Sequence, residues 1–390
     1  MSRIIRFFVD GFRKCDKMLL LLCTVATAFG CLMVASATNY DEDSARYLII
    51  QIGTAIAGIL MYITFSAIDA EVFSERRFWM VIFNTLLLLM LIPFGVTVNG
   101  NRSWLDFPFL PFNIQAAEIC KITFILILAS VMASHQNRLS SVGSVMHMAF
   151  HVGFLVCLNM ALSKDAGVSL IFVAIFVGMA FAGGVKLFWF MIAGGLITVS
   201  IPVIWNYIMD EFQRERIQVL FDPTLDPNGL DARYHTVRSL RSLTGGGMTG
   251  QGLFSGTRTQ QGALFAQHTD YIFSAIGEEL GYVGCVMVIL LLGLIVARCI
   301  FVASRSQDIM RRLICYGAAS ALSFQIIINV GMCIGVMPVI GLTLPFISYG
   351  GSSLVTLYAM MGLVSGVFAR PAAASHERYI RAPYTLNTYR

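Results

Sequence analysis

The sequence predicts an all-α membrane protein, a bundle of about ten transmembrane helices with a long connection between the seventh and the eighth. Of its 390 residues, 57% are hydrophobic and only 13% are charged, unlike a soluble domain. Its apolar runs are about twenty residues long, enough to span a hydrocarbon core of about 30 Å as helix. The candidate spans are roughly 17–38, 46–66, 78–99, 114–133, 143–162, 166–183, 187–209, 270–303, 311–336 and 348–369.

The first span could in principle be a secretory signal peptide. Its apolar run, from Met18 to Ala37, is longer than a typical signal h-region, and no convincing cleavage site precedes the next span. We therefore expect a retained helix and one membrane domain over 1–390, with tails at 1–16 and 370–390.

The basic residues predict the orientation. With ten spans both termini lie on one side, and 17 of the 27 Lys and Arg fall there. Six of the other ten lie in the connection 210–269, which the positive-inside rule does not count because long loops translocate largely regardless of charge. Both termini are therefore expected in the cytoplasm. The basic residues are spread through loops, so nothing indicates binding of nucleic acid.

Polar residues appear at the outer ends of the middle spans. The segment VNGNRSWLDFPFLPFN places Arg102 beside Trp104, either as part of an interfacial aromatic belt or as a substrate contact. In the fourth span Glu118 and Lys121 are three residues apart, on one helix face, which predicts an ion pair. That pair could be structural, or it could contact a substrate in a wet cavity.

Histidine and cysteine give weaker signals. His147 and His151 are four apart on one face of the fifth span, which resembles a helical metal pair but lacks the adjacent Glu of HExxH. Packing and metal binding both stay open. The nine cysteines lie mostly inside spans and predict small buried hydrophobes rather than a disulfide framework.

The connection 210–269 is too long to be structureless. Its first part, DEFQRERIQVLF, predicts an amphipathic helix at the outer interface. The stretches FDPTLDPNGLDARYH and LTGGGMTGQGLFSG are rich in turn residues and glycine, and predict irregular backbone. Such backbone either bends closely around another group or forms a mobile loop in solvent.

Three carboxylates, Asp270, Glu278 and Glu279, enter the membrane with the eighth span. Asp270 and Glu278 are eight residues apart, about 12 Å along a helix, too far for the carboxylate pair of a glycosidase. Asp270 follows Thr269 where an N-cap belongs, so it is either a cap or a carboxylate that works alone. Caps do not reach Glu278 and Glu279, which we expect to pair with bases from neighbouring spans.

Charged groups in the spans gather at the outer ends, with Lys164 and Asp165 adding to those above, and the inner halves carry almost none. Charge near the bilayer centre costs at least about 2.5–3.5 kcal/mol, so the asymmetry favours an outward-facing cavity over a path across the membrane. The segment VMPVIGLTLPFISYGGSSL is broken by proline and glycine. Irregular backbone at membrane depth survives where it lines a cavity, so we expect this segment in the cavity wall.

Three segments together resemble the signature of the SEDS family (shape, elongation, division and sporulation): RERIQVLFDPTLDPNGLDARYH, AQHTDYIFSAIGEELGYVG and GLTLPFISYGGSSLV. The resemblance covers nearly the whole chain. It implies a ten-span glycosyltransferase that polymerises lipid II into peptidoglycan on the outer face of the bacterial cytoplasmic membrane. It also implies a class B penicillin-binding protein as partner and a role in elongation, division or sporulation.

The resemblance also implies the site residues. The aspartate of its HTD motif matches Asp270, as the essential acid. The substrate-binding set that it implies is Arg102, Trp104, Glu118, Lys121, Asp165, His268, Ser348 and Ser352. The chain departs from the family's usual residues at Ala116, Ala117, Lys164 and Ala266, which leaves the subgroup open.

The mechanism that we expect is a single displacement with inversion, because an α-linked pyrophosphate is replaced by a β-1,4 sugar bond. Asp270 would be the one general base, with Glu278 and Glu279 in support. Arg102, Lys121, Arg214 and Arg216 are the outer cations available to the pyrophosphate, Lys121 and Arg216 first among them. A divalent cation, magnesium or manganese, could share that work, and bilayer lipids would surround the polyprenyl tails.

Two other functions fit a ten-span architecture. A transporter or flippase of lipid-linked precursors is one, although the almost uncharged inner halves of the spans argue against it. A scaffold that holds a penicillin-binding protein without catalysis is the other. Polymer formation from lipid II by the purified protein would separate the three.

Overall fold

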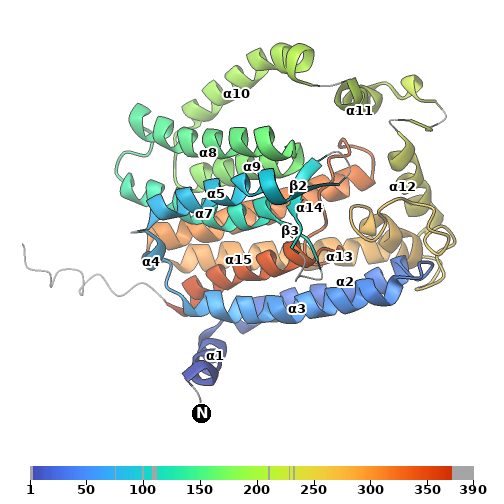
Figure 1. The fold of residues 1–390 in the computed structure, drawn as a ribbon, viewed down its shortest axis with the longest axis horizontal. Helices are drawn as coiled ribbons and strands as arrows, with labels where there is room; N and C mark the ends of the chain where they lie inside the picture. The colour runs from blue at the N-terminus through green and yellow to red at the C-terminus, as the bar shows by residue number, and fades with distance from the viewer. Residues whose placement is uncertain are drawn as a thin grey trace, which may run out of the picture.

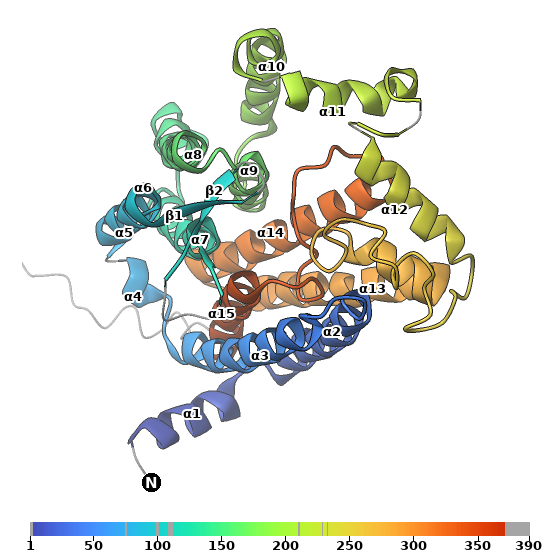
Figure 2. The same ribbon diagram turned by 45° about the vertical axis from the view of Figure 1, so that its right-hand side comes forward.

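The computed structural model describes residues 3–74, 76–98, 101–107, 112–209, 211–227, 229–231 and 233–370. The expected C-terminal tail, 370–390, therefore lies outside the described residues from 371 onward. The fold is almost entirely helical, as predicted, with one small antiparallel sheet. Figures 1 and 2 show a bundle of long helices whose loops gather at one end, near the start of α13.

The described part of the chain forms fifteen α-helices and three strands. The helices are α1 (Arg3–Lys14), α2 (Lys17–Ala37), α3 (Ser44–Ala67), α4 (Glu71–Ser74), α5 (Arg77–Leu89), α6 (Leu91–Phe94), α7 (Ala116–Ser134), α8 (Val142–Ser163), α9 (Ala166–Ala182), α10 (Leu187–Val203), α11 (Glu211–Phe221), α12 (Tyr234–Gly245), α13 (Ile272–Arg305), α14 (Ile309–Cys333) and α15 (Gly351–Ala369). The strands are β1 (Gly95–Val98), β2 (Asn101–Leu105) and β3 (Ile114–Gln115), in the order β1-β2-β3.

All ten predicted spans coincide with helices. Nine helices in the described ranges are long and apolar enough to cross a membrane, and α9, with 17 residues, is a shorter apolar helix. The third span was predicted too long. Its helical part ends at Phe94, and Gly95–Val98 forms β1, which pairs with β2.

Burial separates central helices from lipid-facing ones. In the most apolar 18-residue stretch of α7, and in that of α15, 83% is buried inside the protein. In the corresponding stretch of α10, none is buried. Figure 2 shows α10 standing apart from the bundle, so its uniformly apolar surface suits contact with lipid. The approach of α15 to α3 is close because Gly362 has no side chain: a Cβ there would lie 2.6 Å from the Tyr62 carbonyl oxygen.

A polar network ties the helices together at the end of α13 away from the loops. Asp16 caps α2 by accepting from the backbone N–H groups of Met18 and Leu19, both at 3.2 Å. Its carboxylate also accepts two hydrogen bonds from the Arg298 guanidinium of α13, at 2.8 and 3.0 Å. Both partners are therefore satisfied, as buried charge requires.

The connection 210–269 is ordered along its described residues. The predicted amphipathic helix is present as α11, but the second helix, α12, was not expected from any pattern in the sequence. The glycine-rich stretch after α12 exchanges hydrogen bonds with α13. The Gln251 and Gly252 N–H groups donate to the carbonyls of Glu278 and Glu279, at 3.0 and 2.9 Å. The interpretation as a mobile loop is therefore wrong.

Two further hydrogen bonds join the loop to α13 where the helix is interrupted at Gly281, whose φ of 68° and ψ of −166° are not helical. The N–H groups of Tyr282 and Val283, which would otherwise bond to the carbonyls four residues back, donate to Gly247 and Met248 at 2.9 and 3.2 Å. The backbone groups released by the interruption are thus paired with the loop. Glycine at position 281 is required because side chains rarely adopt that backbone conformation.

Candidate functional site

The turn before α13 carries Asp270 and is held by its backbone. The Thr269 carbonyl accepts from Ser348 Oγ at 2.6 Å. The Asp270 carbonyl accepts from Asn329 Nδ2, on α14, at 2.8 Å. These contacts use main-chain oxygen rather than the Asp270 side chain. The sequence analysis missed Asn329; its sequence signal is an amide between the apolar residues Ile328 and Val330.

Asp270 is not a helix cap, and that alternative is wrong. The residue at the N-cap position of α13 is Tyr271, with no side-chain cap hydrogen bond. The Asp270 carboxylate faces the loop between α14 and α15 instead: a Cβ at Gly341 would lie 3.7 Å from its Oδ2. The segment that contains Gly341 therefore lies beside Asp270, and its place in the wall of an outward-facing cavity stays a prediction.

Burial raises the pKa of Asp270 to about 6, and the negative charge of Asp165 acts in the same direction. Asp165 caps α9 through the Val168 N–H, at 3.1 Å, and its Oδ2 accepts from Ser103 Oγ and Gln115 Nε2, each at 3.2 Å. Burial also raises the pKa of Asp165. Two carboxyl groups thus share one poorly solvated region, which favours a proton acceptor of increased basicity.

Glu118 and Lys121 form the ion pair that their spacing predicts, with 2.7 Å between Lys121 Nζ and Glu118 Oε1. Both side chains are almost fully buried, at 5% and 3% exposure. Thr356 of α15 donates to the other Glu118 oxygen at 3.0 Å. The charge of Glu118 also acts on Asp165, so the pair belongs to the same polar region.

The small sheet carries Arg102 and Trp104 and is bound by Ser352 of α15. The Arg102 guanidinium donates to the carbonyls of Ile92, at 2.7 Å, and Gly95, at 3.2 Å, and is exposed beyond them. Trp104 pairs with Gln115 across β2 and β3, and the Gln115 N–H donates to Ser352 Oγ at 3.2 Å. Arg102 is thus held against the end of α6, while Ser352 fixes the strand that leads into α7.

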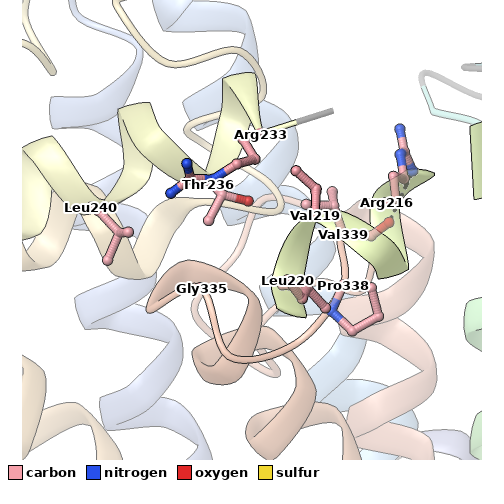
Figure 3. A pocket seen from close by; sticks show the side chains of 9 residues that line it. All are labelled: Arg216, Val219, Leu220, Arg233, Thr236, Leu240, Gly335, Pro338 and Val339. Carbon is pink, nitrogen blue, oxygen red and sulfur yellow. Dashed lines mark hydrogen bonds between the residues drawn. The ribbon is translucent and has the colours of Figure 1, made fainter. Parts of the chain in front are cut away.

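Arg216 lies on α11, and its guanidinium donates to the Val339 carbonyl at 2.9 Å. Beside it is a pocket of about 120 Å³ between α11, α12 and the loop from 334 to 350 (Figure 3). The pocket is lined by Arg216, Val219, Leu220, Arg233, Thr236, Leu240, Gly335, Pro338 and Val339. Arg214, in contrast, donates to the Met209 carbonyl at 3.2 Å.

Glu278 does not pair with a base from a neighbouring span, and that expectation is wrong. Its Oε1 accepts from the Arg258 N–H at 2.8 Å, and its Oε2 from the Thr259 N–H and hydroxyl at 3.0 and 2.7 Å. The charge is stabilised by dipoles of the loop, because a buried carboxylate has to be hydrogen-bonded.

Glu279 was also expected to pair with a base, and it too is bound by uncharged groups instead. It accepts from Ser36 Oγ at 2.7 Å, from Gln260 Nε2 at 2.9 Å and from the Phe254 N–H at 3.3 Å. The two glutamates therefore hold the loop between α12 and α13, which leads directly to the turn of Asp270.

We expect Glu278→Gln to loosen this loop. The amide nitrogen of glutamine cannot accept the hydrogen bonds that one carboxylate oxygen accepts now, and an unsatisfied buried donor costs about 1–3 kcal/mol. Hydrogen exchange at the Arg258 and Thr259 amides should become faster, and the unfolding temperature should fall. Glu42→Gln, at an exposed acid between α2 and α3, is the control. Unchanged exchange at both amides would contradict this role for Glu278.

His268 and Ser348 flank the turn of Asp270. The His268 carbonyl accepts from the Tyr349 N–H at 2.9 Å, and its ring contacts those of Tyr47 and Tyr349. Ser348 Oγ also accepts from the Leu344 N–H at 2.8 Å. Ser348 is thus a fixed part of the turn, and His268 extends from it toward α3.

No group of three or more His, Cys, Asp or Glu side chains in the described ranges is arranged to hold a metal ion. His147 and His151 have ring centroids 5.1 Å apart, and the His135 ring lies 5.4 Å from His147, so these rings contact one another. We predict that a divalent cation at the candidate site is held jointly with a substrate, as Mg²⁺ is by one or two carboxylates and phosphates. That cation remains a prediction.

The chain matches a family model described as "Cell cycle protein", for FtsW, RodA and SpoVE, over residues 16–371. It is 30% identical over 354 residues to the peptidoglycan glycosyltransferase MrdB of Escherichia coli K12, covering 90% of this chain and 93% of that protein. It is 29% identical over 360 residues to the stage V sporulation protein E of Bacillus subtilis 168, covering 90% and 96%.

Solved structures share the fold. One is a chain of a peptidoglycan synthase complex that coordinates polymerization and crosslinking, with a TM-score of 0.76, 28% identity, and coverage of 94% of this chain and 99% of that one. Another is the rod shape determining protein RodA of Thermus thermophilus, with a TM-score of 0.68, 25% identity, and coverage of 92% and 98%. The polytopic helical fold predicted from the sequence is therefore confirmed.

Proposed function

Because the chain belongs to the FtsW, RodA and SpoVE family of cell cycle proteins, we propose that it is a peptidoglycan glycosyltransferase that polymerises lipid II. The observation that best supports the proposal is the combination of a fixed backbone and a raised carboxyl pKa at Asp270. Its backbone is fixed by α14 and the loop before α15, while its carboxylate is held by no helix cap and has a pKa raised to about 6. This is the arrangement of a general base that works near neutral pH.

The reaction is a single displacement at one sugar carbon. The 4-hydroxyl of an acceptor GlcNAc attacks C1 of the donor MurNAc and forms the β-1,4 bond, while the bond from C1 to the α-linked undecaprenyl pyrophosphate breaks. Asp270 takes the hydroxyl proton, and the pyrophosphate leaves with the bonding electron pair. Inversion follows from the single displacement, and one carboxylate suffices.

The leaving pyrophosphate needs positive charge, and Lys121 and Arg216 are our candidates. Lys121 is positioned by Glu118 and, through Glu118, by Thr356, whereas Arg216 is positioned by the Val339 carbonyl. Donors fixed before the reaction stabilise developing charge without reorganisation. Lys121 belongs to α7 and Arg216 to α11, so the two candidate cations come from different elements.

We place the site on the outer face of the cytoplasmic membrane, with both termini in the cytoplasm. The short basic segments support this orientation, with 17 Lys and Arg on the terminal side and four on the other. A class B penicillin-binding protein is the proposed partner, since a structural relative is part of a synthase complex that also crosslinks. The bilayer would hold the polyprenyl tails beside the helices.

Purified protein in liposomes containing lipid II tests this function. We expect glycan polymer, released by a glycan hydrolase as disaccharide units. Movement of lipid II between leaflets without polymer would instead support a flippase. Capture of a penicillin-binding protein with neither activity would support a scaffold. Repeating the assay with and without divalent cations and a chelator tests the metal.

A further inference from the structure

Three rings from separate parts of the chain form a closed cluster beside the turn of Asp270. Tyr47 of α3 lies 5.0 Å from His268 and 5.2 Å from Tyr349, between ring centroids, and His268 lies 5.6 Å from Tyr349. We call Tyr47, His268 and Tyr349 the aromatic triad. Only His268 has a place in the function described so far.

The backbone around the aromatic triad is fixed. The Tyr349 N–H donates to the His268 carbonyl at 2.9 Å. Gln51, one helical turn after Tyr47 on α3, donates to the Ser348 carbonyl at 3.2 Å and accepts from the Gly350 N–H at 3.3 Å. A surface held in this way loses little conformational entropy when a ligand binds.

The aromatic triad differs from the aromatic packing of the core. Tyr358 and Phe346, whose rings also contact each other, are 0% and 2% exposed, whereas all three members of the triad are only partly buried. His268 Nδ1 is a buried nitrogen without a hydrogen-bond partner among the described residues. Such a group is costly to bury unpaired and calls for an explanation.

The ring geometry of the triad does not suit a cation, and its chemistry favours a sugar. Burial lowers the pKa of His268, whereas the negative charge of Asp41 acts in the opposite direction. A cation cage needs ring faces arranged around a space, but here tilted and edge-on rings contact one another. The electron-rich face of an aromatic ring does attract the polarised C–H bonds on one face of a pyranose, and Tyr hydroxyl groups can bind its polar substituents.

We propose that the aromatic triad is a carbohydrate subsite that packs against an N-acetylhexosamine ring of the glycan beside the reacting sugar. This inference rests on the proposed function. His268 and Asp270 are two residues apart, so their Cα atoms lie within about 7 Å. His268 faces α3, whereas Asp270 faces Gly341. A glycan that crosses the turn therefore reaches both.

The sugar ring has two possible sources, lipid II and the growing strand, and Tyr47→Leu distinguishes them. Leucine keeps an apolar side chain but removes the aromatic face, a loss of about three- to tenfold in binding. If lipid II occupies the subsite, its KM rises by that factor while kcat changes little. If the growing strand occupies it, KM is unchanged and the mean strand length falls.

Tyr47→Phe keeps the aromatic face and should recover most of the lost affinity or strand length. Tyr282→Leu, at an exposed tyrosine on α13, controls for the loss of any tyrosine, and unfolding temperatures in detergent control for folding. The proposal is overturned if Tyr47→Leu leaves both KM and strand length unchanged, or if Tyr47→Phe is impaired equally. Failure of the wild-type protein to make polymer in the same assay would count against the proposed function instead.

Discussion

Asp270→Asn should reduce the rate of lipid II polymerisation by about 10²- to 10⁴-fold, the usual contribution of a general base. Asparagine has nearly the same shape, and the contacts that fix the turn use main-chain carbonyls, among them those to Asn329 and Ser348. The turn should therefore persist while the proton acceptor is lost. Initial rates on purified lipid II measure the effect, and polymerisation at the wild-type rate would refute the assignment of Asp270.

The pH dependence of the rate has a definite sign. Asp270 accepts a proton only when ionised, and its pKa is about 6, so the wild-type rate should fall as the pH decreases through 6. The residual rate of Asp270→Asn should show no such decrease at low pH. If the decrease persists in the variant, it is due to the titration of another group.

The stability of Asp270→Asn supplies the control for folding. The folded pKa of Asp270 lies above the unfolded value of about 3.9, so its stabilising contribution is fully present below pH 3.9 and is lost as the pH rises through about 6. Removing the charge should therefore raise the unfolding temperature at pH 7.5 and leave it unchanged near pH 4. A lower unfolding temperature at pH 7.5 would show that the substitution damages the fold.

Lys121→Met should be the most destabilising single change in the polar region around Asp270. It leaves the Glu118 carboxylate buried without its cation, and removing one partner of a buried ion pair costs about 3–5 kcal/mol. Lys164→Met, at an exposed lysine at the same end of the bundle, should cost little. Denaturant unfolding in detergent measures both.

The double variant Glu118→Gln with Lys121→Met separates the structural role of the pair from its role in catalysis. The glutamine introduced by Glu118→Gln would keep an acceptor for Thr356 and carry no charge, so most of the lost stability should return. Polymerisation should stay low if Lys121 binds the pyrophosphate. Recovery of both stability and activity would show that the pair is structural only.

The transmembrane helices were predictable because a bilayer requires long apolar segments, whatever the rest of the chain does. The ion pair of Glu118 and Lys121 was predictable for a local reason, since residues three apart share a helix face. The prediction failed for Glu278 and Glu279 because it looked for opposite charge. Their actual partners are mostly backbone N–H groups and neutral side chains of a loop, which no side-chain pattern reveals.

The sequence by itself determined the class of fold and the approximate positions of its membrane helices, and its motif segments led to the prediction that Asp270 is the essential acid. These properties follow from composition and from spacing along one helix or one motif. Only the tertiary structure decided that Asp270 is no cap, that the glycine-rich loop completes an interrupted α13, and that Tyr47 and Tyr349 meet at His268. Each depends on groups far apart in the chain, whose contact is set by packing and by the need to pair every buried polar group.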